Sequence, residues 1–407
     1  MLAPNTSSAI APDLAQAAPR PLGVYVHFPW CLQKCPYCDF YSLAIERAAI
    51  PHVAYADAVL RELERRRAEL TGYELETVFF GGGTPSLWEP SELGRVLAGI
   101  RAAFPARGEP EVTAECNPSS FDGDRAAALR AAGVNRISLG IQGLERERLE
   151  FLGRLHDAGG ALGALRTAIA TGFPRVSADL IFGVDRQSPE RARDEALAVA
   201  ELGPTHVSAY ALTIEPGTRF GSLARAGKLP LLEEDLVARS FSAVESALES
   251  VGFAHYEISN YARQGHFSRH NLGTWRGHDY LGLGAGAFGT VRTREGRVRY
   301  RNAPATERYA AATVAAPLFR ISELVSDTEL ISAETAFSER LLLGLRLAEG
   351  VDLDEAARET GAPAWTDERE RAISRLVRSG RLAREGSRIT IPRDAWLFAD
   401  GVIRELL

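Results

Sequence analysis

The sequence predicts an α/β protein in which a partial (βα)6 barrel precedes a smaller C-terminal α+β, winged-helix-like domain. Six apolar, β-branched runs of strand length alternate with segments of helical period over the first 250 residues or so. This alternation is typical of βα units that form a parallel sheet. It stops near residue 252, and a second, mainly helical regime begins near residue 330.

The strand-like runs are rich in the residues that favour strands, and they cover residues 23–28, 75–80, 111–116, 135–141, 175–182 and 206–212. Segments of helical period follow them at 51–70, 91–104, 122–132, 159–171, 189–201 and 232–251. Six units in a stretch of this length suit a barrel. Because the chemistry of such barrels lies at the carboxyl ends of the strands, residues just after each run are the candidates for function.

The chain divides into four predicted parts. Residues 1–20 are expected to be a disordered tail, 21–254 the barrel, 255–325 a His- and Gly-rich connecting region, and 326–407 the C-terminal domain. Two helical segments, a hairpin-like stretch at 382–392 and a last helix suggest a winged helix. Residues 367–407 hold nine Arg and seven acidic residues, which favours a structural lid over a DNA reader.

Composition excludes several classes of protein. The 407 residues carry a net charge of −6, which gives no basic excess for binding a nucleic acid backbone. No run of about 18 apolar residues could span a membrane, although peripheral contact with a membrane stays open. The first 20 residues lack the charged and apolar regions of a signal peptide. We therefore expect a cytoplasmic protein.

Three of the four cysteines, Cys31, Cys35 and Cys38, lie within eight residues directly after the first predicted strand. Disulfides are rare in cytoplasmic proteins, and a structural zinc site usually needs a second pair of ligands that is missing here. Three thiolates on one loop suit a [4Fe–4S] cluster, with each sulfur on a different iron. The fourth iron would then be open to a small molecule. Cys116 stands apart and is expected to be a small buried apolar residue.

The C-x3-C-x2-C spacing resembles the signature of the radical S-adenosylmethionine family. Other segments continue the resemblance in order over about residues 22–400: YVHFPWCLQKCPYCDF, FFGGGTPS, AECNP, RISLGIQ, LGRLH, SADLIFG and YALTIEPGT. They are most similar to the branch that contains oxygen-independent coproporphyrinogen III oxidase and its haem-chaperone relatives.

This resemblance implies a radical S-adenosylmethionine barrel whose fourth cluster iron is chelated by the cofactor's amino and carboxylate groups. Cys31, Cys35 and Cys38 would hold the cluster. In the family, the Gly-rich segment after the second strand holds the cofactor's methionine part. The cofactor residues implied by the matching motifs are Tyr25, Gly82, Gly83, Thr84, Glu115, Gln142, Arg154 and Asp179.

Four of the eight histidines fall between His255 and His278. The haem-chaperone branch carries an H-N-x-x-Y-W pattern here that is associated with haem binding. This chain reads His270-Asn271-Leu272-Gly273-Thr274-Trp275, so Thr replaces the Tyr. A neutral imidazole is a common haem ligand, and His270 is the predicted haem-binding residue. The nearby G-x-G-x-x-G at 284–289 lacks the following helix of a dinucleotide site and suggests a close-packed turn instead.

Two functions share this scaffold. The first is a haem chaperone that passes haem to an unidentified acceptor protein while keeping the cluster and cofactor site. The second is the oxidase, which decarboxylates two propionates of coproporphyrinogen III through a radical. The oxidase branch has a fourth cysteine two residues after the third, and Phe40 stands there in this chain. This favours the chaperone over a decarboxylase. A radical enzyme acting on another tetrapyrrole-like substrate is a third reading.

Overall fold

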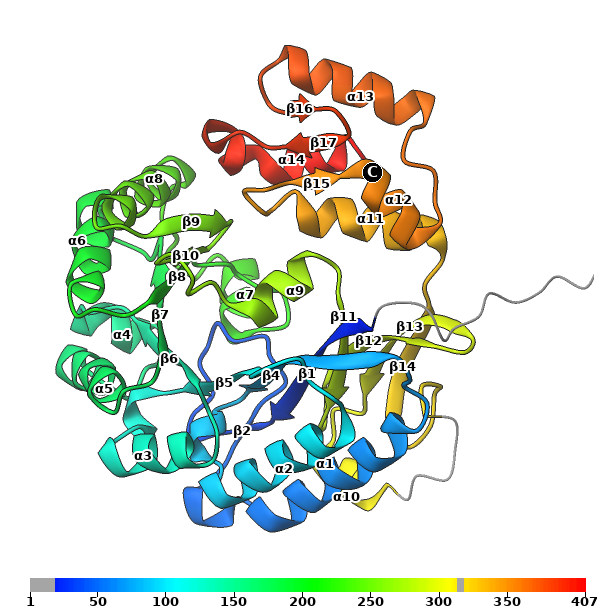
Figure 1. Cartoon of the computed structure of the whole chain (residues 1–407). Coiled ribbons are helices and arrows are strands. Elements are labelled where there is room, and N and C mark those ends of the chain that lie inside the picture. The colour runs from blue at the N-terminus through cyan, green and yellow to red at the C-terminus, as the bar shows by residue number, and fades with distance from the viewer. Residues whose placement is uncertain (1–18, 313–317) are drawn as a thin grey trace, which may run out of the picture.

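The computed structural model describes residues 19–312 and 318–407. Most of the predicted N-terminal tail, residues 1–18, lies outside the described residues, whereas Arg20 already begins the first strand. The fold is the predicted α/β barrel with a smaller C-terminal domain (Figure 1).

Six parallel strands form the barrel wall, and each corresponds to a predicted run. They are β1 (Arg20–Phe28), β4 (Tyr73–Gly82), β5 (Glu111–Cys116), β6 (Arg136–Gln142), β7 (Arg175–Phe182) and β8 (His206–Ala211), adjacent in that order. Side chains alternate between the faces of each strand. Val24, Val26 and Phe28 of β1 are fully buried, and Phe28 packs on Trp88 and Tyr55 outside the sheet.

Helices cover the outer face of this wall (Figure 1). They are α1 (His52–Arg67), α2 (Pro90–Ala103), α3 (Gly123–Ala131), α5 (Ala158–Ala170), α6 (Pro189–Ala200) and α8 (Glu234–Ser250). Asp122, Asp157 and Ser188 cap three of them by accepting a backbone N–H, as such residues do at helix starts. The helices bury their apolar faces against the strands and leave the inner face of the sheet for a pocket.

The sheet continues beyond the predicted barrel. β11 (Asp279–Leu283) pairs in parallel with β1, and β12 (Phe288–Thr293), β13 (Gly296–Asn302) and β14 (Val325–Leu330) extend it in antiparallel fashion. At the other edge β10 (Asn260–Ala262) joins β8, and β9 (Ala254–Glu257) follows. Most of the region expected to connect two domains is therefore part of the barrel sheet. The glycines at 284 and 286 form a left-handed turn before the β12–β13 hairpin.

Short elements complete the barrel edge. They are β2 (Trp30–Cys31), β3 (Leu43–Ala44), α4 (Arg146–Phe151), α7 (Arg219–Arg225), α9 (Arg269–Trp275) and α10 (Thr306–Ala311), with 3₁₀ turns at 47–49, 85–87 and 118–120. α9 contacts β4 and β11 on one side and the C-terminal domain on the other.

The C-terminal domain has its own apolar core. Its elements are α11 (Ala333–Gly344), β15 (Val351–Asp352), α12 (Leu353–Thr360), α13 (Asp367–Arg378), β16 (Ala383–Glu385), β17 (Arg388–Thr390), a 3₁₀ turn at 393–398 and α14 (Ala399–Arg404). This is the order of a winged helix, with the three strands paired β15-β17-β16. The domain sits on β9, β10 and α9 (Figure 1), where Ile258 N–H donates to Arg346 O and Arg276 pairs with Glu349 at 2.8 Å.

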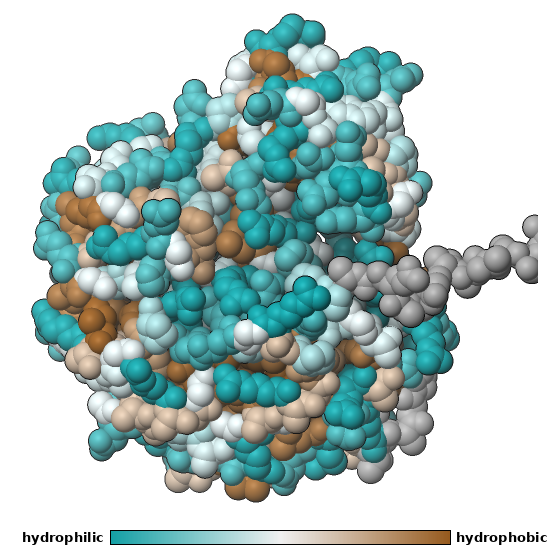
Figure 2. Space-filling model, in the orientation of Figure 1, coloured by the Kyte–Doolittle hydropathy of each residue, from teal (hydrophilic) through white to brown (hydrophobic). Residues whose placement is uncertain are grey.

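The outer surface is mixed in character. Figure 2 shows apolar residues in small groups among hydrophilic ones on the face in view. Among residues 19–312 and 318–407, no helix is long and apolar enough to cross a membrane.

Candidate functional site

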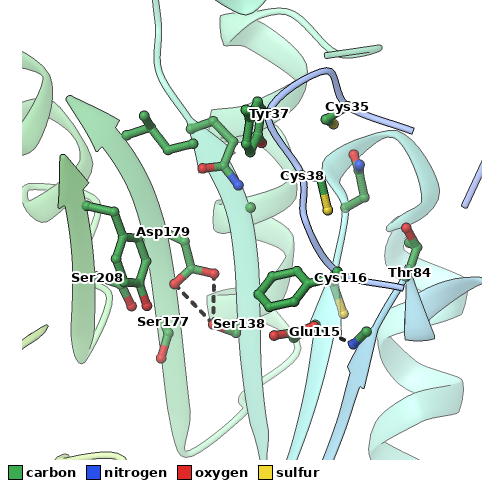
Figure 3. A pocket seen from close by; sticks show the side chains of 18 of the residues that line it. Cys35, Tyr37, Cys38, Thr84, Glu115, Cys116, Ser138, Ser177, Asp179 and Ser208 are labelled. Atoms are coloured by element: carbon green, nitrogen blue, oxygen red, sulfur yellow. Dashed lines mark hydrogen bonds between the residues drawn. The ribbon is translucent and has the colours of Figure 1, made fainter. Parts of the chain in front are cut away.

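A pocket of about 540 Å³ opens on the inner face of the barrel, beside the carboxyl ends of the strands. Figure 3 shows it from close by, with Cys35 and Cys38 near one end and Ser177 near the other. Its lining includes the three clustered cysteines and seven of the eight predicted cofactor residues: Gly82, Gly83, Thr84, Glu115, Gln142, Arg154 and Asp179. Residues far apart in sequence thus meet because parallel strands end at one edge of the sheet.

The cysteine loop begins at the end of β2. All three cysteines are half-buried free thiols. Thr84 Oγ1 donates to Cys31 Sγ at 3.5 Å, and Arg154 Nη1 donates to Cys35 Sγ at 3.4 Å. Burial raises the pKa of the Cys31 thiol and raises that of Cys38 to about 11. Thiolates at these positions therefore need nearby positive charge, which Arg154 supplies in part.

The donor arrangement distinguishes between kinds of metal centre. In the described part of the chain, no three His, Cys, Asp or Glu side chains are gathered as ligands around a single metal ion. A mononuclear zinc site would need such a group. The three thiols instead face one pocket from separate points of the loop, which fits the larger [4Fe–4S] unit, whose irons are ligated one sulfur each.

The three glycines at the end of β4, Gly81 to Gly83, are required by packing. A Cβ at Gly83 would lie 2.6 Å from Trp30 O, and one at Gly82 would lie 2.6 Å from His27 Cε1. A Cβ at Gly81 would lie 2.9 Å from the Tyr25 ring. Glycines let a ligand approach the backbone closely, which fits the cofactor role that the family resemblance implies for this segment. The structure adds a second reason, because the chain of β1 and β2 passes directly against them.

Two carboxylates face the pocket. Glu115 Oε2 accepts a hydrogen bond from Gly82 N–H at 3.1 Å (Figure 3), and Asp179 accepts from Ser138 Oγ at 2.9 Å. Burial, together with the charge of Asp179, raises the pKa of Glu115 to about 8. Burial also raises the pKa of Asp179. Each carboxylate is costly to keep charged without a cationic or hydrogen-bonding partner, and both are therefore suited to hold the polar groups of a ligand.

Gln142 is held in an unusual backbone conformation at the end of β6. Its φ is 66°, a left-handed value that non-glycine residues rarely adopt. Its buried Oε1 has no hydrogen-bond partner among the described residues. Strain and an unmet acceptor in one pocket residue are typical of ligand sites.

Tyr25 is the one predicted cofactor residue outside the pocket lining. Its hydroxyl hydrogen-bonds His27 Nδ1 at 3.0 Å, and its ring stacks on Phe79 at 6.2 Å between centroids. Phe79 itself lines the pocket. Tyr25 thus lies beside Phe79, its register partner on the neighbouring strand, and supports the wall there.

The histidines that cluster in the sequence separate in space. His255 is buried between Tyr261 and Trp396, and its Nδ1 bonds Glu245 at 2.8 Å. His278 lies beside Glu76. His270, at the start of α9, stacks on Phe79 at 4.9 Å and bonds Thr77 Oγ1 at 2.8 Å through Nδ1. Of these three, His270 packs directly behind a residue that lines the pocket.

Sequence reasoning missed the far end of the pocket. Thr113, Arg136, Ser177 and His206 line it there, near the amino ends of their strands. A signal was available, because polar residues recur at every second position of otherwise buried strands, as in Ser177 and Asp179 or His206 and Ser208. Phe40, at the cysteine end, lines the pocket and is 60% exposed.

A partial parallel barrel with three cysteines on the loop after its first strand defines the class of radical S-adenosylmethionine proteins. Residues 25–197 match the family model "Radical SAM superfamily", and residues 331–398 match "HemN C-terminal domain". The chain is 36% identical over 397 residues to "Heme chaperone HemW" of Mycobacterium tuberculosis, covering 97% of both proteins. It is 41% identical to "Heme chaperone HemW" of Escherichia coli, covering 68% of this chain and 72% of that protein.

The chain belongs to the radical SAM superfamily, and within it to the HemW-like branch. Among solved structures it resembles "Coproporphyrinogen III oxidase (HemN) from Escherichia coli is a Radical SAM enzyme", with a TM-score of 0.78 at 20% identity, over 96% of this chain and 91% of that one. At this identity the likeness concerns the fold alone. The superfamily implies a [4Fe–4S] cluster and S-adenosylmethionine.

Proposed function

We propose that this protein is a haem chaperone, which binds haem and transfers it to an acceptor protein while carrying a [4Fe–4S] cluster with exchangeable S-adenosylmethionine. The observation that carries the proposal is the 36% identity over nearly the whole length to a relative named "Heme chaperone HemW". The likeness to the oxidase structure supports the shared barrel but, at 20% identity, no shared reaction.

In this proposal Cys31, Cys35 and Cys38 hold the cluster, whose fourth iron supplies an open position for the amino and carboxylate groups of S-adenosylmethionine. The support is the gathering of three thiols with a strained Gln142 and two carboxylates in one pocket. The residues assigned to the cofactor are Gly82, Gly83, Thr84, Glu115, Gln142, Arg154 and Asp179, with Tyr25 supporting the wall. Arg154 and Thr84 orient two of the sulfurs.

His270 is proposed as the haem-binding residue. Burial lowers the pKa of His270 to about 4, so the imidazole is neutral and able to bind iron at neutral pH. Its bond to Thr77 through Nδ1 fixes the ring, as partners of metal-binding histidines commonly do. In the described part of the chain, Nε2 has no hydrogen-bond partner. The neighbouring Ser268 and Asn271 line the pocket, as does Phe79.

Phe40 separates this proposal from the oxidase alternative. The oxidase branch that this chain resembles has a cysteine at that position. Here the exposed Phe40 ring lines the pocket and supplies no thiol. An apolar ring at the mouth of the pocket is better suited to contact a flat apolar ligand.

One anaerobically reconstituted sample tests both functions. A haem titration followed by a turnover assay with coproporphyrinogen III is the measurement. We expect stoichiometric haem binding and no decarboxylation. Turnover at rates of about one per second or above, typical of an enzyme, would replace the chaperone with the oxidase. Absence of a Soret band would overturn haem binding itself.

A further inference from the structure

The end of the pocket farthest from the cysteines carries a strip of polar side chains from four neighbouring strands. Strand register sets Thr113 of β5 opposite Arg136 of β6, and Ser177 of β7 opposite His206 of β8. Arg136 Nη2 donates to Ser177 Oγ at 3.0 Å and so joins the two pairs. All four line the pocket and each is no more than 2% exposed.

His206 presents a hydrogen-bond donor to this space. Tyr256 OH accepts from Ser268 N–H at 3.3 Å and lies 2.8 Å from His206 Nε2. If the tyrosine hydroxyl donates to Nε2, the single proton of the neutral ring is on Nδ1. Only this Nδ1–H then lacks a partner among the described residues. If Nε2–H instead donates to the tyrosine oxygen, two groups lack a partner there: the tyrosine O–H and the acceptor Nδ1. We therefore assign the proton to Nδ1, which is buried and has no partner among the described residues.

Thr113 adds a second unmet group. Its buried Oγ1 has no hydrogen-bond partner in the described part of the chain, although buried hydroxyls nearly always have one. Two unpartnered polar atoms in one strip, Thr113 Oγ1 and His206 Nδ1, indicate that a ligand atom completes the site.

The charge at this end identifies the ligand atom as an anionic acceptor. Arg136 lies 3.4 Å and Arg175 3.9 Å from Glu111, so two guanidinium groups face one carboxylate and these three side chains together carry a net charge of +1. The carboxylates of Glu115 and Asp179 are each two residues nearer the carboxyl end of their strands than Thr113 and Ser177. Three donors and one surplus positive charge match a monoanionic carboxylate.

We propose that this strip is a carboxylate-binding subsite that takes one propionate of haem, with Thr113, Arg136 and His206 as its donors. The proposal rests on the haem-binding function proposed above. His270 and the strip are linked through Glu111, which accepts from His270 N–H at 3.2 Å and pairs with Arg136. The imidazole proposed for the iron stacks on Phe79 of the pocket wall, and its helix is bonded to the same Glu111 that pairs with the donor Arg136.

The test compares haem with its dimethyl ester, in which both propionates are blocked. The full-length wild-type protein should bind haem about tenfold or more tighter than the ester, as expected for hydrogen bonds to a charged group. Thr113→Val should lose most of this preference, and Thr113→Ser, which keeps the hydroxyl, should retain it. Because Thr113 Oγ1 has no hydrogen-bond partner among the described residues, Thr113→Val should not lower the melting temperature.

Ser240→Ala is the matched control, since it removes a fully buried hydroxyl on α8 that bonds Leu236 O. It should leave the preference for haem over the ester unchanged. Equal binding of haem and ester by the wild type, or a preference that survives Thr113→Val undiminished, would overturn the subsite and leave haem binding intact. Binding of neither ligand would overturn the proposed function and the subsite together.

Discussion

Arg154 donates a hydrogen bond from Nη1 to Cys35 Sγ at 3.4 Å and another from Nη2 to Gly140 O at 3.1 Å. It therefore ties the cysteine loop to the end of β6. The guanidinium brings a positive charge into direct contact with a thiol of this loop.

Replacing Arg154 with Leu should weaken assembly of the cluster, because Cys35 would lose both its orientation and its nearby charge. Iron and sulfide per chain after anaerobic reconstitution are the measurement, and both should fall clearly below the wild-type level. Arg146→Leu is the control, because Arg146 lies on the surface and pairs with the exposed Glu150. Full cluster content in Arg154→Leu would show that the contact with Cys35 is incidental.

Substitution of Cys31, Cys35 or Cys38 by Ser should abolish the cluster of about four irons and four sulfides. Cys116→Ser should retain it, since Cys116 is buried against Ala114 O and belongs to a different strand. Chemical analysis and the absorbance of the reconstituted proteins distinguish the two outcomes. A complete cluster in Cys35→Ser would refute the ligand assignment.

Glu115 should make the stability of the cofactor-free protein depend on pH. Its pKa is about 8 in the fold and about 4.3 in an unfolded chain. Between these values the folded state binds more protons than the unfolded state, so stability falls as pH rises. Glu115→Gln keeps an acceptor for Gly82 N–H and removes this dependence.

The free energy of unfolding, measured by denaturant titration at pH 5 and pH 9, tests this expectation. Glu115→Gln should gain on the order of a few kcal/mol over the wild type at pH 9, and little or nothing at pH 5. If the free energies of unfolding of Glu115→Gln and the wild type differ by the same amount at pH 5 and pH 9, Glu115 is not the titrating group.

His270→Ala should shift or weaken the Soret band of the haem-loaded protein, because the iron would lose its proposed ligand. The cluster should be unaffected, since its cysteines lie on another loop. His278→Ala is the matched control, because His278 lies beside Glu76, whereas His270 stacks on Phe79 of the pocket lining. An unchanged spectrum and affinity in His270→Ala would move the search for the ligand to His266.

The six barrel strands and their helices could be predicted because each has a local periodic signature, and the strand-end residues followed from the geometry of parallel sheets. The joining of β11 to β1 could not, since Asp279–Leu283 is a short run beside glycines and its partner lies more than 250 residues earlier. The donor strip at Thr113 and His206 was missed because a polar residue in a buried strand gives no local sign of whether it faces a helix or a cavity. The histidines between 255 and 278 are close in sequence, but strand and helix turns direct them to different neighbours.

The helix that carries His270 has only seven residues, Arg269–Trp275, too few to be stable alone. On its inner side Phe79 stacks on His270, and on its outer side Arg346 of the C-terminal domain lies over the Trp275 ring at 5.9 Å. Arg276, directly after the helix, pairs with Glu349. Contacts with the winged-helix domain thus help to hold this part of the pocket wall in place. A molecule that binds the C-terminal domain and shifts it would therefore also move α9, and with it the pocket wall.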